Sequence, residues 1–213
     1  MKQNQKLRFL IAGLAIITFF IGLYTDNYIM RMIAKPIPLF MLISMIKPSE
    51  HYQKFMFIGL IFSVMGDLLL EASPKLFAFG LVAFLIAHIN YIIAFAKREK
   101  QLNLKSAIPI FIYGAILYWI LFPTLDKMAI PVFFYVIVIL TMVWRAFTQR
   151  SFDDFAKYAF IGSVFFVFSD SLIALNKFHA PIEYSRPIIM ITYWTAQFFI
   201  FSSAFKELRI KSR

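Results

Sequence analysis

The stretch Lys54-Phe-Met-Phe-Ile-Gly-Leu-Ile-Phe-Ser-Val-Met-Gly-Asp-Leu-Leu-Leu-Glu71 is apolar enough to cross a membrane, yet it carries a carboxylate, Asp67, near one end. A charged side chain inside a membrane helix costs roughly 2.5–3.5 kcal/mol on insertion scales, so its default interpretation is functional. A second stretch, Phe165-Phe-Val-Phe-Ser-Asp-Ser-Leu-Ile-Ala-Leu175, places Asp170 in similar surroundings. Any hypothesis about the function has to account for these two apolar helices, each of which carries one aspartate beside a small residue.

The composition indicates an integral membrane protein. The 213 residues are 61% hydrophobic with a mean hydropathy of +0.75, and only 15% are charged, against about 25% in soluble domains. No polar segment is long enough for a soluble domain, so we expect residues 1–213 to form a single membrane domain. The chain has no cysteine, which excludes disulfides and thiolate chemistry. The net charge of +11 is typical of basic cytoplasmic loops beside anionic lipid, and we expect no nucleic-acid partner.

The apolar segments predict an all-α, polytopic membrane protein with eight transmembrane helices in one bundle. Each segment approaches the ~20 residues that span a bilayer. The eight segments are 7–24, 32–46, 54–71, 76–97, 104–122, 130–148, 155–176 and 186–206. Lys35-Pro36 and Pro38 fall in the second segment, so we expect it to start irregularly or to be kinked.

Lysine and arginine predict the orientation of these helices. With the N-terminus in the cytoplasm, the inner segments and tail hold 16 basic residues and the outer segments hold 6. We therefore expect both termini to be cytoplasmic, in a multi-pass protein of the bacterial inner membrane. The two aspartate-bearing helices are four helices apart, so an internal duplication would be a parallel four-plus-four repeat. The shared signal is only a few residues long, and coincidence is the alternative.

This orientation places polar side chains from five helices at overlapping depths. Buried polar groups in lipid need partners, which favours one shared interior cavity over scattered sites. The residues at these depths are Lys35, Asp67, His88, Asp170, Tyr193 and Gln197.

Each of these residues also has a purely structural interpretation. Either aspartate could pair with Lys35 in an interhelical salt bridge, and Lys35 could instead extend to the surface. His88 could be a hydrogen-bonded core residue, Tyr193 an interface aromatic and Gln197 a helix–helix contact. The sequence positions of the other carboxylates indicate solvated loop charges; these are Asp26, Glu71, Asp126 and Glu183.

A metal site built from Asp67, His88 and Asp170 is an alternative, because such ligands suit zinc or manganese. The chain has no HxxxH pair, and His88 is the one histidine within an apolar segment. We therefore expect neither a metal nor another cofactor.

At these residues the sequence resembles the YhhN family of multispanning membrane proteins, which includes the lysoplasmalogenases. The likeness extends over nearly the whole chain in length and motif order. Its matching elements are Lys35-Pro36, Gly66-Asp67, Ala87-His88 with Tyr91, Ser169-Asp170-Ser171, and Tyr193 with Ala196-Gln197. The resemblance implies a hydrolase that cleaves the vinyl ether bond of lysoplasmalogen. Its substrate would be a membrane lysophospholipid, and its products a fatty aldehyde and a glycerophosphoethanolamine or glycerophosphocholine.

Two aspartates suit this implied chemistry. A vinyl ether hydrolyses when its β-carbon is protonated, and water attacks the resulting oxocarbenium ion, as in glycoside hydrolysis. A pair of carboxylates in a low-dielectric cavity supplies a protonated acid and an ionised partner, because desolvation and repulsion keep one of them neutral. We therefore expect Asp67 and Asp170 to be catalytic. The substrate-binding residues would be Lys35, His88, Tyr91, Tyr193, Gln197 and Arg186, with Lys35 or Arg186 on the phosphate.

Two other function classes fit the same residues. Intramembrane carboxylates also serve proton relays, so a proton-coupled transporter or a lipid-binding membrane protein is the first alternative. A metal-dependent lipid hydrolase is the second, and sensitivity to chelators would identify it. The sequence makes no prediction of the oligomeric state.

Overall fold

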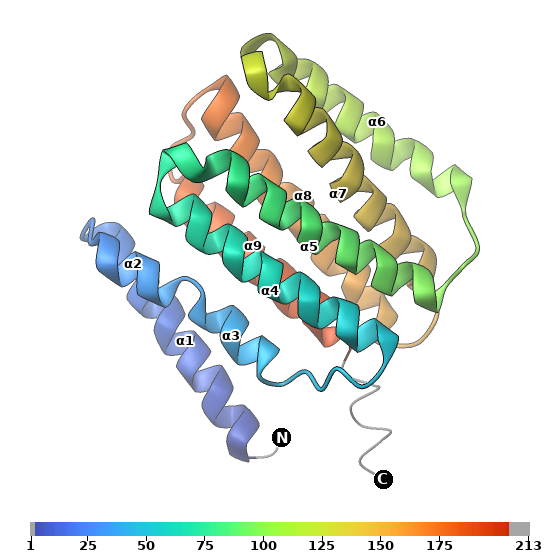
Figure 1. The fold of residues 1–213 in the computed structure, drawn as a ribbon, viewed down its shortest axis with the longest axis horizontal. Helices are drawn as coiled ribbons and strands as arrows, with labels where there is room; N and C mark the ends of the chain where they lie inside the picture. The colour runs from blue at the N-terminus through green and yellow to red at the C-terminus, as the bar shows by residue number, and fades with distance from the viewer. Residues whose placement is uncertain (1–2, 205–213) are drawn as a thin grey trace. The chain divides into compact units, whose positions relative to one another are not determined.

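The computed structural model describes residues 3–204, and every regular element in that range is a helix, which confirms the all-α prediction. Figure 1 labels these helices. The chain divides into two compact units between Asn90 and Tyr91, within one long helix. Each unit is described by itself.

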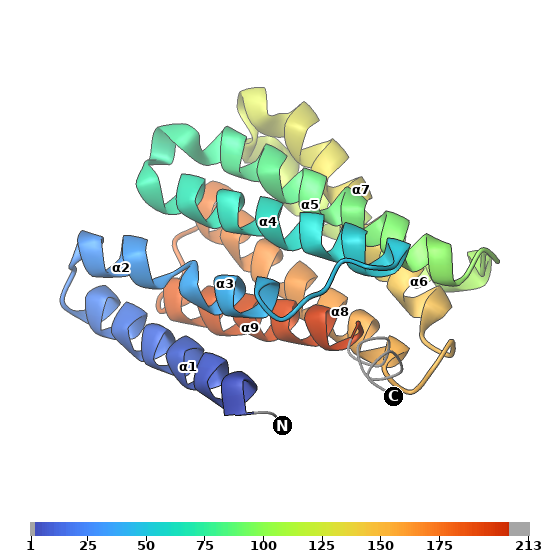
Figure 2. The ribbon, with the colours of Figure 1, turned by 60° about the horizontal axis from the view of Figure 1, so that its bottom comes forward.

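The first unit begins with one long helix beside two short ones. Its elements are α1 (Gln3–Tyr24), α2 (Tyr28–Ala34), α3 (Ile37–Ile43), α4 (His51–Ala72), the 3₁₀ turn η1 (Pro74–Leu76) and the start of α5 (Phe77–Arg98). Helix α1 packs against both α2 and α3 (Figure 2). The side chain of Asn27 caps α2 by accepting a hydrogen bond from the backbone N–H of Met30. Lys35-Pro36 separates α2 from α3, because proline has no backbone N–H for a continuous helix.

Glycines allow α4 and α5 to approach closely. A Cβ on Gly66 would lie 2.6 Å from the ring of Phe84, and one on Gly80 would lie 2.6 Å from Leu70. Small residues at such contacts are typical of membrane helices, where packing replaces the hydrophobic effect. The contact on Gly66 fixes the part of α4 that carries Asp67.

The second unit contains the rest of α5 and the four later helices. They are α6 (Leu104–Leu121), the 3₁₀ turns η2 (Phe122–Thr124) and η3 (Asp126–Met128), α7 (Ala129–Gln149), α8 (Ala156–Ala174), the π-helical turn η4 (Leu175–His179) and α9 (Ser185–Ser202). Helix α6 packs on α7, α7 on α8, and α8 on α9. Pro131 lies in the first turn of α7, where a missing backbone N–H is tolerated.

The α8–α9 contact brings two backbones together. A Cβ on Gly162 would lie 2.6 Å from the carbonyl oxygen of Ala196 and 2.8 Å from the backbone nitrogen of Ile200. The same face of α8 buries the small side chains of Ala159 and Ser163. This contact fixes the half of α9 that carries Tyr193 and Gln197.

Six helical segments within residues 3–204 are long and apolar enough to cross a membrane. They are Gln3–Tyr24, His51–Ala72, Pro74–Arg98, Leu104–Thr124, Asp126–Gln149 and Ala156–His179. The protein is therefore a multi-pass, all-α membrane protein. The predicted segment 32–46 is divided between α2 and α3, and 186–206 corresponds to α9. Residues 205–206 and the basic residues of the predicted cytoplasmic tail lie outside the described part of the chain.

Candidate functional site

Asp67 lies on the unbroken helix α4 and is 2% exposed. The contacts of Gly66 with Phe84 and of Gly80 with Leu70 set an antiparallel register between α4 and α5. Because His88 is one turn beyond Phe84, it lies on the face of α5 that meets α4. His88 is completely buried. The first unit therefore holds two predicted site residues, Asp67 and His88, on packed faces of neighbouring helices.

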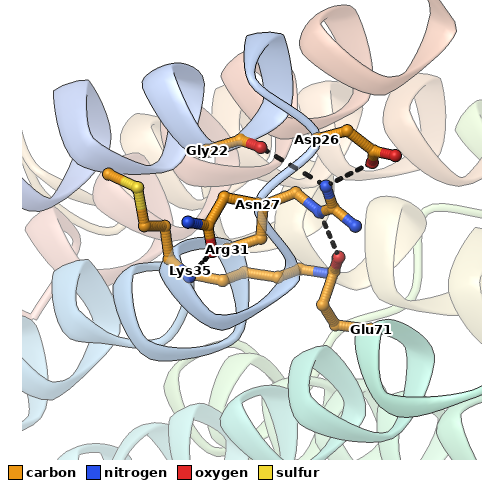
Figure 3. A network of polar contacts seen from close by, with 7 residues as sticks. Gly22, Asp26, Asn27, Arg31, Lys35 and Glu71 are labelled. Carbon is orange, nitrogen blue, oxygen red and sulfur yellow. Dashed lines mark hydrogen bonds and ion pairs between the residues drawn. The ribbon is translucent and has the colours of Figure 1, made fainter.

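A charged cluster lies at the end of α4, and it corrects one prediction. Glu71 is not a solvated loop charge: it belongs to α4, and its side chain is only 5% exposed. Its Oε1 accepts a hydrogen bond from Arg31 Nε at 3.0 Å, and its Oε2 accepts one from Lys35 Nζ at 3.3 Å (Figure 3). Sequence reasoning placed Glu71 at the last position of the predicted segment 54–71 and interpreted it as a solvated charge, whereas the helix continues to Ala72 and Glu71 contacts both cations.

Arg31 is the other residue of this cluster that the sequence analysis missed. Its Nη1 donates to Asp26 Oδ1 at 2.9 Å and to the carbonyl oxygen of Gly22 at 3.3 Å. Burial lowers the pKa of Arg31, but its hydrogen bonds to Glu71 and Asp26 outweigh burial and raise that pKa above its ordinary value. Asp26 is exposed as predicted, although it also contacts Arg31.

In the second unit, Asp170 is the centre of a polar contact between four helices. The hydroxyl of Tyr135 on α7 donates a hydrogen bond to Asp170 Oδ2. The flanking serines bind the other neighbours: Ser169 Oγ donates to the carbonyl oxygen of Ile189 on α9 at 3.1 Å, and Ser171 Oγ lies 2.8 Å from the hydroxyl of Tyr113 on α6. Three consecutive residues of α8 thus contact α6, α7 and α9.

Neither Tyr113 nor Tyr135 was among the predicted site residues. Their sequence positions could have indicated a polar contact, since each tyrosine places a hydroxyl group within an otherwise apolar helix. Both hydroxyls have hydrogen-bond partners, Ser171 for Tyr113 and Asp170 for Tyr135, although Tyr113 is 42% exposed.

Three predicted residues of the second unit do come together. The hydroxyl of Tyr91 donates to Gln197 Oε1 at 2.9 Å, and both side chains are completely buried. Tyr193, one turn before Gln197 on α9, packs edge-on against Phe166 with ring centroids 5.4 Å apart. The Nε2 atom of Gln197 is buried and has no hydrogen-bond partner among the described residues. A donor is therefore available beside Tyr193.

Arg186 lies in the first turn of α9 and is exposed. Lys35, Asp67 and His88 belong to the first unit, whereas Arg186 belongs to the second unit with the residues around Asp170. Within the described part of either unit, no three histidine, aspartate or glutamate residues form a group that could hold a metal ion.

Comparison with known protein families identifies the family of this chain. The YhhN family matches residues 30–204, a range that includes every predicted site residue from Lys35 to Gln197. The chain belongs to the YhhN family.

The curated relatives of this YhhN protein share one activity in their names. The chain is 36% identical over 155 residues to the lysoplasmalogenase TMEM86A of Bos taurus, covering 70% of the chain and 64% of that relative. It is 35% identical over 157 residues to the lysoplasmalogenase TMEM86A of Homo sapiens, again covering 70% of the chain and 64% of that relative. It is 31% identical over 160 residues to the human lysoplasmalogenase TMEM86B, covering 75% of the chain and 67% of that relative.

This YhhN protein spans slightly less than two thirds of the length of the TMEM86A relatives. No solved structure matches the chain.

Proposed function

We propose that this YhhN protein is a membrane-embedded hydrolase that cleaves the vinyl ether bond of lysoplasmalogens. Its products would be a fatty aldehyde and a glycerophosphoethanolamine or glycerophosphocholine. The observation that carries this proposal is the family match over residues 30–204, which contains Asp67 and Asp170, together with relatives named lysoplasmalogenase.

The two aspartates differ in their surroundings, and the difference suggests their roles. Asp170 accepts a hydrogen bond from Tyr135, and such donors stabilise a carboxylate. Asp67 is 2% exposed, and the reaction needs a second carboxyl group that carries a proton. We assign Asp67 as the general acid and Asp170 as the carboxylate that stabilises the cation and activates water. The assignment requires both side chains to reach one vinyl ether.

The reaction needs no other proton donor. Asp67 gives its proton to the β-carbon of the vinyl ether, which leaves an oxocarbenium ion at the carbon bonded to oxygen. Water adds to that carbon and gives a proton to Asp170, forming a hemiacetal. The hemiacetal hydroxyl then returns a proton to Asp67 while Asp170 protonates the departing glycerol oxygen. Both aspartates regain their starting states, as in paired-carboxylate hydrolysis.

The remaining predicted residues would bind the substrate. The Nε2 group of Gln197 can donate to the free hydroxyl of the glycerol, because Tyr91 occupies the other end of that amide. His88 and Tyr193 are also proposed to contact the substrate, and Lys35 or Arg186 would hold the phosphate. The proposed reaction uses no metal or other cofactor.

A direct assay tests the proposed activity. Purified protein is incubated with lysoplasmenylethanolamine, and we expect fatty aldehyde to be released, whereas the saturated alkyl ether analogue stays intact because it has no double bond to protonate. Movement of intact lipid without aldehyde would identify a transporter. Loss of activity on chelation, with recovery in zinc or manganese, would identify a metal-dependent hydrolase that uses Asp67, His88 and Asp170 as ligands.

The membrane topology is a separate proposal. We propose eight spans, with α2–α3 and α9 added to the six long helical segments, in a single domain of the bacterial inner membrane. The excess of basic residues on one side of this arrangement supports cytoplasmic termini. A fluorescent-protein fusion at the C-terminus is expected to fluoresce, and an alkaline phosphatase fusion there to be inactive. The reverse pattern would refute the orientation. The four-plus-four repeat stays a prediction.

A further inference from the structure

A buried arginine lies near the end of α7, in the second unit. Arg145 is 4% exposed and forms no ion pair with a carboxylate in the described part of the chain. Its Nη2 donates to the carbonyl oxygen of Glu99, and its Nη1 donates to that of Gln101 at 3.2 Å. The charge of Glu99 also attracts the guanidinium, but the Oε1 of Glu99 accepts a hydrogen bond from the backbone N–H of Gln101. A buried cation held by neutral carbonyls favours an anionic ligand.

The same face of α7 presents buried polar atoms that have no partner. Among the described residues, nothing forms a hydrogen bond with Nε of Arg145 or with either end of the side-chain amide of Gln149. Gln149 is completely buried and lies one turn after Arg145. Buried polar atoms without partners are unfavourable. A ligand that both accepts and donates hydrogen bonds would therefore stabilise this face of the helix.

The contacts between α7 and the α5–α6 connection do not use these atoms. Trp144 Nε1 donates to the carbonyl oxygen of Asn103 at 2.9 Å, so Trp144 and Arg145 together hold this connection by three carbonyls. Such a clasp needs only the two Nη atoms of the arginine and gives no role to Nε or to Gln149. The Nε edge of a guanidinium has two parallel N–H groups, which match two oxygens of a phosphate.

The surroundings of Arg145 carry an excess of positive charge at the level of the lipid head groups. The α5–α6 connection and the end of α7 lie at the ends of candidate membrane spans. Segments 97–105 and 145–157 together hold seven basic and three acidic residues, so the excess remains after every acidic residue is paired. It also remains when Glu207, the one acidic residue after the described part of the chain, is counted. Basic segments beside a membrane attract anionic lipids.

We propose that Arg145 and Gln149 bind the head group of an anionic phospholipid. The phosphate oxygens accept hydrogen bonds from Arg145 Nε and Gln149 Nε2. A hydroxyl of the head group donates to Gln149 Oε1, because a phosphate diester has no proton to donate. Phosphatidylglycerol has both the negative charge and the hydroxyls, whereas phosphatidylethanolamine is zwitterionic. This lipid is a bound partner and not a substrate, so the proposal does not depend on the proposed vinyl ether cleavage.

Lipid binding to the full chain tests this proposal directly. The protein is delipidated in detergent, and binding is measured by native mass spectrometry. Phosphatidylglycerol is expected to bind at least about tenfold more tightly than phosphatidylethanolamine and to raise the Tm of the protein. Equal affinity for the two lipids would contradict an anionic head-group site. Inorganic phosphate is expected to compete weakly, and displacement of phosphatidylglycerol by an equal concentration of phosphate would contradict a lipid site.

Two substitutions of Gln149 make the test specific to this face of α7. Gln149→Glu is expected to raise the Tm of the lipid-free protein, because its carboxylate pairs with Arg145, and to weaken phosphatidylglycerol binding at least about tenfold, because it repels phosphate. Gln149→Leu removes the amide without adding charge and is expected to weaken that binding about tenfold. The matched control is Lys105→Gln, which removes an exposed positive charge at the same end of the helices and is expected to change binding less than about twofold.

The alternative is a clasp in which Arg145 only holds the α5–α6 connection. That alternative predicts that both Gln149 variants bind phosphatidylglycerol as the wild type does, and this result would overturn the proposal. Equal losses of binding in Lys105→Gln and Gln149→Leu would mean a general attraction to positive charge and would overturn it as well. Neither Gln149 variant removes the carbonyl contacts of Arg145, so the test does not depend on a variant that loosens the connection.

Discussion

Asp67→Asn is expected to reduce aldehyde release from lysoplasmenylethanolamine by about 10²–10⁴-fold, the usual contribution of a general acid. Asparagine nearly preserves the shape of the side chain but cannot give a proton to the β-carbon. Asp170→Asn is expected to cause a loss of similar size, because it removes the negative charge opposite the oxocarbenium ion. Turnover is measured across pH with equal amounts of monodisperse protein.

The pH dependence and two further variants make this test specific. The pH–rate profile of each variant is expected to lose one limb, although coupled carboxylates titrate as a pair. Tyr135→Phe retains Asp170 but removes its donor, so we expect a smaller loss with both limbs kept. Asp126→Asn, at an exposed turn position, is the matched control and is expected to keep full activity. A folded Asp67→Asn or Asp170→Asn variant with near wild-type turnover would show that this aspartate is structural.

The long helices were predictable because their signal is local. An apolar run of about 20 residues usually forms a membrane-spanning helix. The six long spans could therefore be predicted from the distribution of apolar residues along the chain. The break at Lys35-Pro36 was also predictable, since proline restricts its own backbone.

The sequence grouped polar residues by their depth in the membrane but did not predict which of them pair. Tyr91 and Gln197 are polar groups in apolar helices, and the structure pairs them across a sequence separation of 106 positions. Glu71 was misinterpreted because its cations come from residues 36 and 40 positions earlier, which no local pattern reveals. The partners of Tyr135 and Tyr113 were missed for the same reason, because a lone tyrosine in an apolar helix also fits a lipid interface.

Helix α9 shows how a close contact between two helix backbones can control the site. It carries Tyr193 and Gln197, yet it is not among the six segments that qualify as membrane spans by length and composition. Its position depends on α8, where Gly162 lies against the backbone of Ala196 and Ile200. Neither backbone atom can move aside as a flexible side chain would.

Gly162→Ala is therefore expected to destabilise the protein by about 3 kcal/mol, at the upper end of typical overpacking costs. The added Cβ would lie 2.6 Å from the carbonyl oxygen of Ala196, so α9 has to move away from α8. Thermal unfolding in detergent would show a lowered Tm, and activity should fall with it because Gln197 moves. Gly13→Ala is the matched control, since its Cβ meets no atom within 4 Å and alanine favours a helix. Equal Tm values for the two variants would mean that α8 and α9 separate at no cost, and that their close contact does not position the site.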